Sequence, residues 1–399
     1  MAAPVYDPTS AAILDDPYST YAALRERSPV HHEERLNLWV LSRHEHVSAA
    51  LRDWEHYSSS PVGDTGIDGY RFLIGADPPD HTTLRRLVNK AFHPRAIADM
   101  EPRIRAICDE LLDDLLVAAK DGAEVDLVTG LTQPLPVIVI AEMLGIPAQR
   151  RADFKRWSDA MIGGLSPDAD RAVMGATVME MFGYFDEVAA QRRQDPPVND
   201  GTTPVDLITQ LVSGAEPLTN QEVLMFCMLL LVAGNETTTN LLSNLMLAAF
   251  AHPGTLDVLR ADPTLIPSAI EETLRYDAPV QCLWRKTTAQ VTVDGTTIPK
   301  DELVVVLYAS ANRDERAFSN ADQFIVDRYL GKTGPGQTDH LGFGTGIHMC
   351  LGAPLARLEA RVAVEALLER TTAVAPAGEP VRMRNQIVRG LTALPVTIE

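Results

Sequence analysis

The most informative stretch of this 399-residue chain is HLGFGTGIHMCLGAP, residues 340–354. It brings four glycines, two histidines and one cysteine together directly before a segment of helical periodicity. Glycine lets a backbone approach a flat or bulky group closely. A cysteine thiolate binds metals and is stabilised by the free N–H groups at the start of a helix. The stretch therefore indicates a metal-containing group held against the backbone near Cys350.

Competing explanations of these residues fail on spacing. Gly342, Gly344 and Gly346 do not have the G-x-G-x-x-G pattern of a dinucleotide-binding loop, and no clear strand precedes them. The other cysteines are widely spaced and form no C-x-x-C pair, so neither a zinc knuckle nor a disulfide framework is indicated. We expect Cys108, Cys227 and Cys282 to be buried as small apolar side chains.

The charge balance excludes several classes of function. The chain has 35 Lys and Arg against 54 Asp and Glu, a net charge of −19, whereas nucleic-acid binders and binders of anionic membranes need a basic face. The first residues do not read as a secretory signal. The longest apolar run, residues 223–233, is shorter than the roughly 20 residues that span a bilayer, so it predicts a buried helix. We expect a cytoplasmic protein without a membrane span.

Helical periodicity dominates the chain and predicts a mainly α fold with a small β region. Helices are expected at residues 18–27, 45–54, most of 81–194, 205–275 and 354–370. Strands are expected at 36–41, 302–307, in a hairpin over 289–299 around Asp294-Gly295, and in short runs within 380–399. Residues 195–204 read as a surface loop. The chain shows no βαβ alternation, which argues against a doubly wound sheet.

The run from Phe343 to Gly352 resembles the complete haem-ligand loop, F-G-x-G-x-H-x-C-x-G, of the soluble bacterial cytochrome P450 superfamily. This resemblance implies that Cys350 is the axial thiolate ligand of the iron of a b-type haem, with Phe343, Gly344, His348 and Gly352 contacting that haem. It also implies that residues 1–399 form a single P450 haem domain without a fused reductase. The haem would lie between the long buried helix and the helix that follows the cysteine.

A second segment, residues 233–238 (AGNETT), interrupts the buried apolar run with an acid and threonines. Taken alone it could mark a break between two helices, since glycine and β-branched residues weaken a helix. In the family, the glycine at this place makes room for dioxygen and an acid–threonine pair relays protons. By resemblance, Gly234, Glu236 and Thr237 take these roles, the last two as catalytic residues.

Three further groups match the family in order along the chain. Glu272 and Arg275, at i and i+3 of one helix, could be an ordinary surface pair. By resemblance they form a structural brace with Arg328. The remaining matches are His81, Arg85, Arg285 and His348. By resemblance they contact the haem propionates, although each alone could be a solvated charge.

The resemblance implies a monooxygenase that inserts one atom of dioxygen into an apolar small molecule. Electrons would come from NAD(P)H through a separate ferredoxin and its reductase. A local basic patch for this donor would comprise Arg85, Arg86, Lys90, Arg95, Arg357 and Arg361. The substrate pocket would include Leu230, Ala233, Gly234, Val280, Leu283 and Ile387. Residues 61–73 and a methionine-rich wall of Met174, Met179, Met181 and Phe182 would add to it, although such a stripe is more often plain core.

Two other functions use the same haem loop. A hydrogen-peroxide-driven peroxygenase would not need the proton relay, whereas Glu236 with Thr237 favours the reductase-fed enzyme. A non-catalytic haem-thiolate sensor or carrier would need neither a deep apolar pocket nor Thr237.

Overall fold

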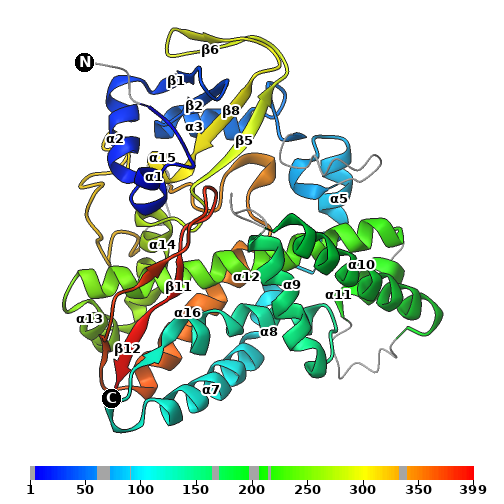
Figure 1. Cartoon of the computed structure of the whole chain (residues 1–399), viewed down its shortest axis with the longest axis vertical. Coiled ribbons are helices and arrows are strands. Elements are labelled where there is room, and N and C mark those ends of the chain that lie inside the picture. The colour runs from blue at the N-terminus through cyan, green and yellow to red at the C-terminus, as the bar shows by residue number, and fades with distance from the viewer. Residues whose placement is uncertain are drawn as a thin grey trace.

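A computed structural model describes residues 5–60, 72–89, 91–163, 170–196, 206–213, 217–331 and 339–399 of the chain. Most of the described residues are helical. The main sheet lies at one end of the molecule, beside the first helices of the chain, whereas the C-terminal strands run along the helical part (Figure 1). This arrangement confirms the mainly α class with a small β region. Residues 61–71 and 197–205, which belong to the expected pocket segment and surface loop, lie outside the described part.

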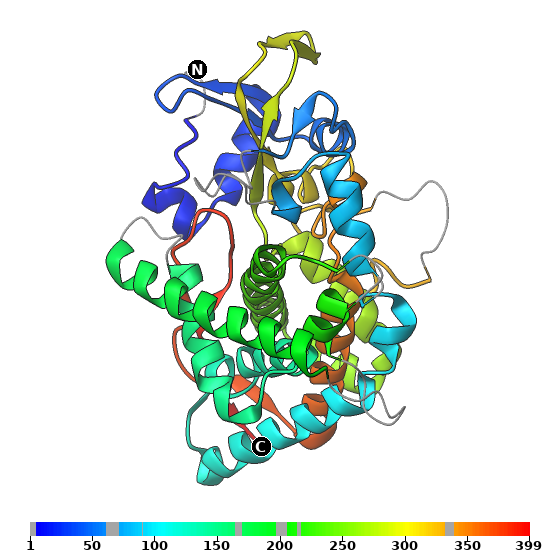
Figure 2. The same cartoon turned by 90° about the vertical axis from the view of Figure 1, so that its right-hand side faces the viewer.

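The central element is α12, Asn220–Ala251, which Figure 2 shows nearly end-on in the middle of the helices. It begins with a capping box, in which the Thr219 side chain accepts from the Glu222 backbone and the Glu222 side chain accepts from Thr219. The helix is apolar around much of its circumference, as expected of a helix buried on all sides. It continues through residues 235–240, so the alternative of two helices broken at that segment is excluded.

Several helices surround α12 and bury its apolar surface. Those in extensive contact with it are α8 (Pro134–Met143), α9 (Arg151–Gly163), α10 (Arg171–Gln194), α14 (Ile266–Tyr276) and α16 (Ala353–Arg370). A further helix, α7 (Glu101–Ala118), packs on the outer side of α16. The remaining helices are α1 (Ala11–Asp15), α2 (Tyr18–Arg27), α3 (His44–Arg52), α5 (Asp80–Asn89), α6 (Pro94–Ala98), α11 (Leu207–Ser213), α13 (Thr255–Ala261) and α15 (Tyr308–Asn312).

The main sheet has the strand order β1-β2-β8-β5-β3. Its strands are β1 (Val30–Glu33), β2 (Leu38–Leu41), β3 (Tyr57–Ser58), β5 (Cys282–Thr287) and β8 (Leu303–Leu307). Strands β2 and β8 run parallel, and the other neighbours are antiparallel. The sheet lacks the all-parallel order of a doubly wound fold, as the sequence predicts.

Three small sheets complete the described strands. The hairpin β6 (Val291–Val293) to β7 (Thr296–Ile298) turns at Asp294 and Gly295, both with positive φ, which is the geometry predicted from the Asp-Gly pair. The second small sheet has the strand order β4-β12-β9 and consists of β4 (Val125–Asp126), β12 (Pro395–Ile398) and β9 (Val374–Pro376). In the third, β10 (Val381–Arg382) pairs with β11 (Leu391–Ala393).

The predicted elements agree with the structure where a segment carries its own periodicity. The helix expected at 18–27 and the one expected at 354–370 correspond to α2 and α16, and the strand expected at 302–307 corresponds to β8. The sequence did not predict β5, a six-residue strand of the main sheet, nor β1, β3, β4 and β9, which are two to four residues long. The latter four are too short to carry much periodicity, and their pairing is decided by the neighbouring strand.

Candidate active site

The loop before α16 folds back on itself to present Cys350. The Gly344 N–H donates to the Leu341 carbonyl and the Cys350 N–H donates to the Phe343 carbonyl, each at 2.9 Å. Gly346 has φ +75°, and a Cβ built there would lie 2.5 Å from the Leu51 carbonyl oxygen of α3. Glycine is therefore required at this position by both its conformation and its packing.

The Cys350 sulfur lies at the start of α16 and faces a cavity. Burial among protein atoms raises the pKa of the Cys350 thiol, while the N–H groups of Gly352 and Ala353 and the cations of Arg85 and Arg357 lower it. A metal bound to the sulfur would deprotonate it outright. Cys350 has accessible surface because it lines the cavity, although protein atoms surround it, whereas Cys108, Cys227 and Cys282 are buried as predicted.

A cavity of about 220 Å³ separates Cys350 from α12. Of the predicted pocket residues, Leu230, Ala233, Gly234, Val280 and Leu283 line it, together with Thr237. Leu73, from the expected segment 61–73, also lines it. Further lining residues that the sequence analysis did not assign to the pocket are Ile74, Phe92, Ile140, Phe226, Leu229, Thr238, Leu241, Leu274, Tyr308 and Glu359. The wall is predominantly apolar, which suits a hydrophobic ligand.

Some residues expected at the pocket lie elsewhere. Ile387 is not among the lining residues, and its carbonyl accepts from the Gln281 N–H at 2.7 Å. In the expected methionine wall, Met181 is fully buried in the core while Met179 is exposed to solvent. Helical spacing shows that such residues share a face, but it does not show which neighbour that face meets.

Two histidines and two arginines gather beside the cysteine loop. The rings of His81 and His348 lie 4.4 Å apart, and the Nε2 atom of each is buried without a hydrogen-bond partner in the described part of the chain. Burial, together with His81, Arg285 and Arg85, lowers the pKa of His348 to about 3. Burial and then Arg85 likewise lower the pKa of His81. The cluster therefore offers hydrogen-bond donors and the positive charge of two arginines, with Asp77 as the acid near His81.

The predicted acid–threonine pair lies on α12, but its members face different surroundings. The Thr237 hydroxyl donates to the Ala233 carbonyl at 2.7 Å, and Thr237 lines the cavity. Glu236 is buried and is not among the lining residues. Burial and the nearby charge of Asp159 on α9 raise the pKa of Glu236 to about 7.

The predicted trio of Glu272, Arg275 and Arg328 forms a buried ion cluster. The Glu272 carboxylate receives two hydrogen bonds of 2.8 Å from Arg275 and one of 2.8 Å from Arg328. It also accepts the Ile325 N–H at 2.9 Å. All three side chains are buried, which excludes the alternative of a solvated surface pair.

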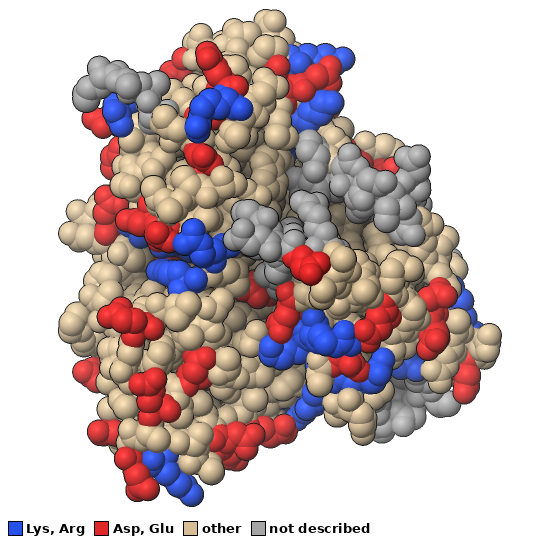
Figure 3. All heavy atoms as spheres, in the orientation of Figure 1, with Lys and Arg blue, Asp and Glu red and all other residues tan. Residues whose placement is uncertain are grey.

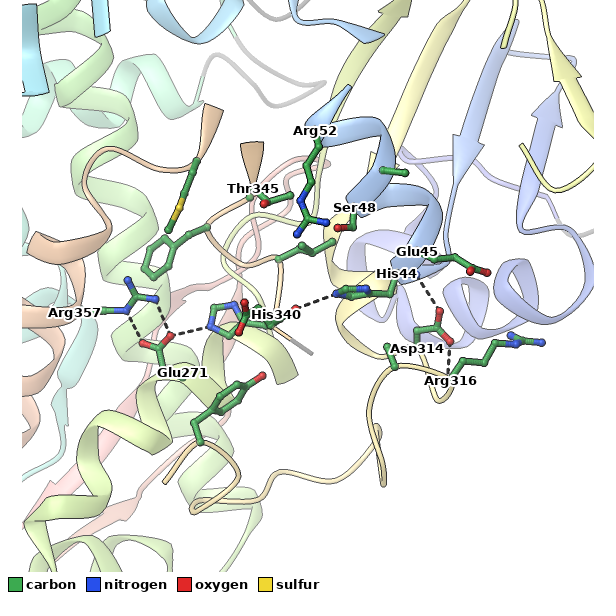
Figure 4. Close-up of a pocket in the computed structure, with 18 residues that line it drawn as sticks. His44, Glu45, Ser48, Arg52, Glu271, Asp314, Arg316, His340, Thr345 and Arg357 are labelled. Atoms are coloured by element: carbon green, nitrogen blue, oxygen red, sulfur yellow. Dashed lines mark hydrogen bonds and ion pairs between the residues drawn. The ribbon is translucent and has the colours of Figure 1, made fainter. Parts of the chain in front are cut away.

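The neighbouring acid, Glu271, makes a second cluster that the sequence did not reveal. As Figure 4 shows, His340 before the cysteine loop and Arg357 after it both reach the Glu271 carboxylate. The Arg357 bonds are 2.6 and 2.8 Å and the His340 Nε2 contact is 3.0 Å. Because His340 Nδ1 accepts the Gly342 N–H at 3.1 Å, the proton belongs on Nε2. Arg357 also stacks over the Phe343 ring.

The expected basic patch is partly neutralised. Arg357 is paired with Glu271, and Arg361 is paired with Glu101 and Glu365. The Arg85 guanidinium is half-buried and donates to the Met349 carbonyl at 2.8 Å. Arg86 and Arg95 are exposed, and Lys90 lies outside the described residues.

Comparisons with known proteins agree on one family. The family model described as cytochrome P450 matches residues 34–398. A cytochrome P450 monooxygenase of Streptomyces venezuelae, PikC, is 39% identical over 398 residues, covering 96% of this chain and 91% of that protein. A vitamin D(3) 25-hydroxylase of Pseudonocardia autotrophica is 37% identical, covering 98% and 96%. The solved structure of cytochrome P450 CYP109Q5 from Chondromyces apiculatus has a TM-score of 0.87 at 38% identity, covering 100% and 99%.

The fold and the site thus define a haem-thiolate protein, and the chain belongs to the cytochrome P450 family. Its named bacterial relatives make it a P450 monooxygenase. No helix in the described part of the chain is long and apolar enough to cross a membrane.

The residues present fit the haem that the family implies. The unpartnered nitrogen atoms of His81 and His348, with Arg85 and Arg285 beside them, are suited to the carboxylates of such a group. The apolar cavity is suited to its ring, and a sulfur ligand faces that cavity from the start of a helix.

Proposed function

We propose that this P450 hydroxylates, or oxidises in a related way, an apolar small molecule with electrons from a separate ferredoxin. NAD(P)H would supply those electrons through a ferredoxin reductase in the cytoplasm, and residues 1–399 would act as a single haem domain. The observation that carries the proposal is that Cys350 and Thr237, from opposite walls, line the same apolar cavity.

In this proposal Cys350 is the protein ligand of the haem iron. The haem, when bound, supplies the activation of dioxygen, and a thiolate ligand favours cleavage of its O–O bond. His81, Arg85, Arg285 and His348 hold the propionates by charge-assisted hydrogen bonds. The cysteine loop, through Phe343, Gly344 and Gly352, would contact the ring, and the Glu272 cluster would brace that loop.

The residues of α12 would supply space and protons. The nearest heavy atom to a Cβ built on Gly234 lies at 3.0 Å, on Ile140, so a larger residue there would crowd the wall of the cavity. The Thr237 hydroxyl, which donates to the Ala233 carbonyl, can accept a hydrogen bond from water in the cavity. A pKa of about 7 places Glu236 close to the value that suits proton exchange near neutral pH.

The substrate proposal follows from the apolar wall of the cavity. Phe92, Phe226 and Leu229 offer a surface without charge, so a neutral hydrophobic molecule is favoured. The relative named as a vitamin D(3) 25-hydroxylase supports this class of ligand.

A separate electron donor would dock by local charge, because the chain as a whole is acidic. On the face shown in Figure 3, Lys and Arg side chains are interspersed with Asp and Glu and form no continuous basic area among the described residues. We propose the exposed Arg86 and Arg95 as residues of this docking surface.

The test is the difference spectrum of the dithionite-reduced protein with and without carbon monoxide, beside a Cys350→Ser control. A thiolate ligand should give a strongly red-shifted Soret band that the control lacks. A band at the position of histidine-ligated haems, or the same band in the control, would contradict the assignment of Cys350.

A further inference from the structure

A buried ion cluster that the proposed function does not use lies at the C-terminal end of α14. Its centre is Asp277, the residue that caps this helix. The Asp277 carboxylate accepts a hydrogen bond of 3.0 Å from Arg389 and one of 3.1 Å from Arg382. The Tyr18 hydroxyl of α2 donates a third bond, of 2.7 Å. Asp277 therefore joins the end of α14 to the first helices and to the C-terminal strands.

The two arginines hold the turn of residues 383–390, which joins β10 to β11. Figure 1 shows this turn, in red, reaching from the C-terminal strands towards the first helices. The turn packs against the segment that follows α14. The Arg389 N–H donates to the Pro279 carbonyl at 2.8 Å, and Val280 and Val388 form an isolated β-bridge. Since an isolated bridge lacks the regular ladder of a paired strand, side chains around it have to hold the turn in place.

The central helix α12 takes part in the cluster through the buried Asn244. The Asn244 Nδ2 donates to the Asp277 carbonyl at 2.9 Å and to the Arg389 carbonyl at 3.0 Å. Its Oδ1 accepts from Arg382 at 3.2 Å. Four side chains thus connect α12, α14 and the C-terminal turn by bonds of fixed direction.

Asp277 keeps its charge although it is buried. Burial raises its pKa, but the cations of Arg389 and Arg382 oppose that rise, and the pKa lies below its usual value. Replacing a buried ion cluster by well-packed apolar residues often costs no stability, whereas removing one partner alone does. A gain in stability is therefore a weak reason for such a cluster, and the geometry that its bonds fix is a stronger one.

The geometry that the cluster fixes is that of one part of the cavity wall. Pro279 and Val280 follow the end of α14 directly, and Leu274 lies one turn before that end. On α12, Leu241 lies one turn before Asn244. All four apolar residues line the cavity, whereas the members of the cluster are not among its described lining residues. The cluster therefore lies one layer behind the apolar wall.

We propose that Asp277 is a positioning residue for the substrate, because it holds the wall at Pro279 and Val280 in place. The proposal rests on the proposed function, in which a hydrophobic substrate binds in this cavity. A wall that is already ordered lowers the cost of binding, since less freedom is lost. Without the Asp277 charge, Arg382 and Arg389 would lie next to each other without a counter-ion, and their repulsion would loosen the turn that supports the wall.

The test compares two nitrogen ligands of the haem iron in the ferric holoprotein, titrated through the shift of the Soret band. Imidazole is small, whereas 4-phenylimidazole carries an apolar ring that has to occupy the cavity. Asp277→Asn should raise the Kd of 4-phenylimidazole about tenfold, the cost of ordering one or two side chains on binding. The Kd of imidazole should stay the same. This measurement requires neither turnover nor the natural substrate.

A milder variant and a matched control accompany it. Tyr18→Phe removes the hydroxyl bond to Asp277 but keeps the ring, and it should raise the Kd of 4-phenylimidazole about threefold, in line with the loss of one hydrogen bond. The control is Asp206→Asn, which breaks a largely buried ion pair with Arg192 away from the cavity wall. It should lower thermal stability but leave both Kd values unchanged.

A purely structural role for the cluster predicts a different pattern. Asp277→Asn would then lower thermal stability and either change both Kd values equally or change neither, and each of these results would overturn the proposal. If Asp277→Asn does not fold, an unchanged Kd of 4-phenylimidazole in Tyr18→Phe overturns it. Absence of the thiolate-type carbon monoxide band in the unsubstituted protein would instead refute the proposed function itself. The two failures are therefore distinguishable.

Discussion

At the scale of single residues, Thr237 occupies an unusual place for a hydroxyl within an apolar wall. Its side chain bonds the carbonyl one turn earlier, at Ala233, and both residues line the cavity. Such a bond satisfies the hydroxyl donor while leaving an oxygen lone pair directed to the cavity. The residue can therefore hold a water molecule or an oxygen ligand without leaving its rotamer.

Replacing Thr237 tests whether this hydroxyl handles protons. We expect Thr237→Ala to consume NAD(P)H but to form product about a hundredfold more slowly, at the low end of what positioned acid–base groups contribute. The electrons should appear as hydrogen peroxide instead. Product and peroxide are to be measured per NAD(P)H, with Thr237→Ser as the hydroxyl-retaining control. A peroxygenase would keep its peroxide-driven activity in Thr237→Ala, and a sensor would show no turnover to lose.

At the scale of elements, α14 fixes the two ends of the cysteine loop through one carboxylate. Glu271 is bonded to His340 ahead of the loop and to Arg357 on α16 behind it. His340 and Arg357 lower the pKa of Glu271 to about 2 against the effect of burial. The folded state therefore gains stability from this carboxylate above pH 4.5 and loses it as the pH falls from 4.5 to about 2.

We expect Glu271→Gln to lower the free energy of unfolding at pH 7 by about 1–2 kcal/mol, a figure discounted for the partial exposure of Arg357. The variant should also have a smaller thiolate-type fraction in its carbon monoxide complex, because the cysteine loop loses its tie to α14. Glu101→Gln is the matched control, because it breaks a surface ion pair with Arg361, which lies on α16 as Arg357 does. An equal effect in both variants would show that the tie has no special role.

At the scale of the whole molecule, the cavity lies where segments far apart in the sequence meet. Its wall is contributed by α5, α8, α12, α14, α16 and the strand β5, among others. A ligand filling this space contacts elements from both the helical part and the main sheet. Binding to the folded state alone stabilises it by an amount set by the free ligand concentration and its Kd.

Removal of the haem should therefore lower the stability of the whole fold. With haem a thousandfold above its Kd, we expect a loss of about 4 kcal/mol and a fall of about 5 °C in Tm on extraction. Far-UV circular dichroism melts of the holoprotein, the apoprotein and the haem-reconstituted protein measure this. Equal Tm values in all three samples would mean that haem does not bridge the elements of the fold.

The sequence by itself determined the features that depend on local spacing. The pattern around Cys350 fixes a tight glycine-containing turn and a helix start, because φ, ψ and close approach restrict those positions to glycine. Glu272 and Arg275 share a helical face at i and i+3, so their pairing followed from the sequence, and the structure places them as expected. The hairpin at Asp294-Gly295 was predicted for the same local reason.

Only the tertiary structure decided which buried faces meet the cavity. Glu359 and Thr238 are far apart in the chain and carry no shared pattern, yet packing of α16 on α12 brings them to one wall. Ile387 and Glu236 are not part of that wall, which their positions in the sequence do not show. The hydrophobic effect is not directional, so periodicity identifies a face that must be buried but not the partner that buries it.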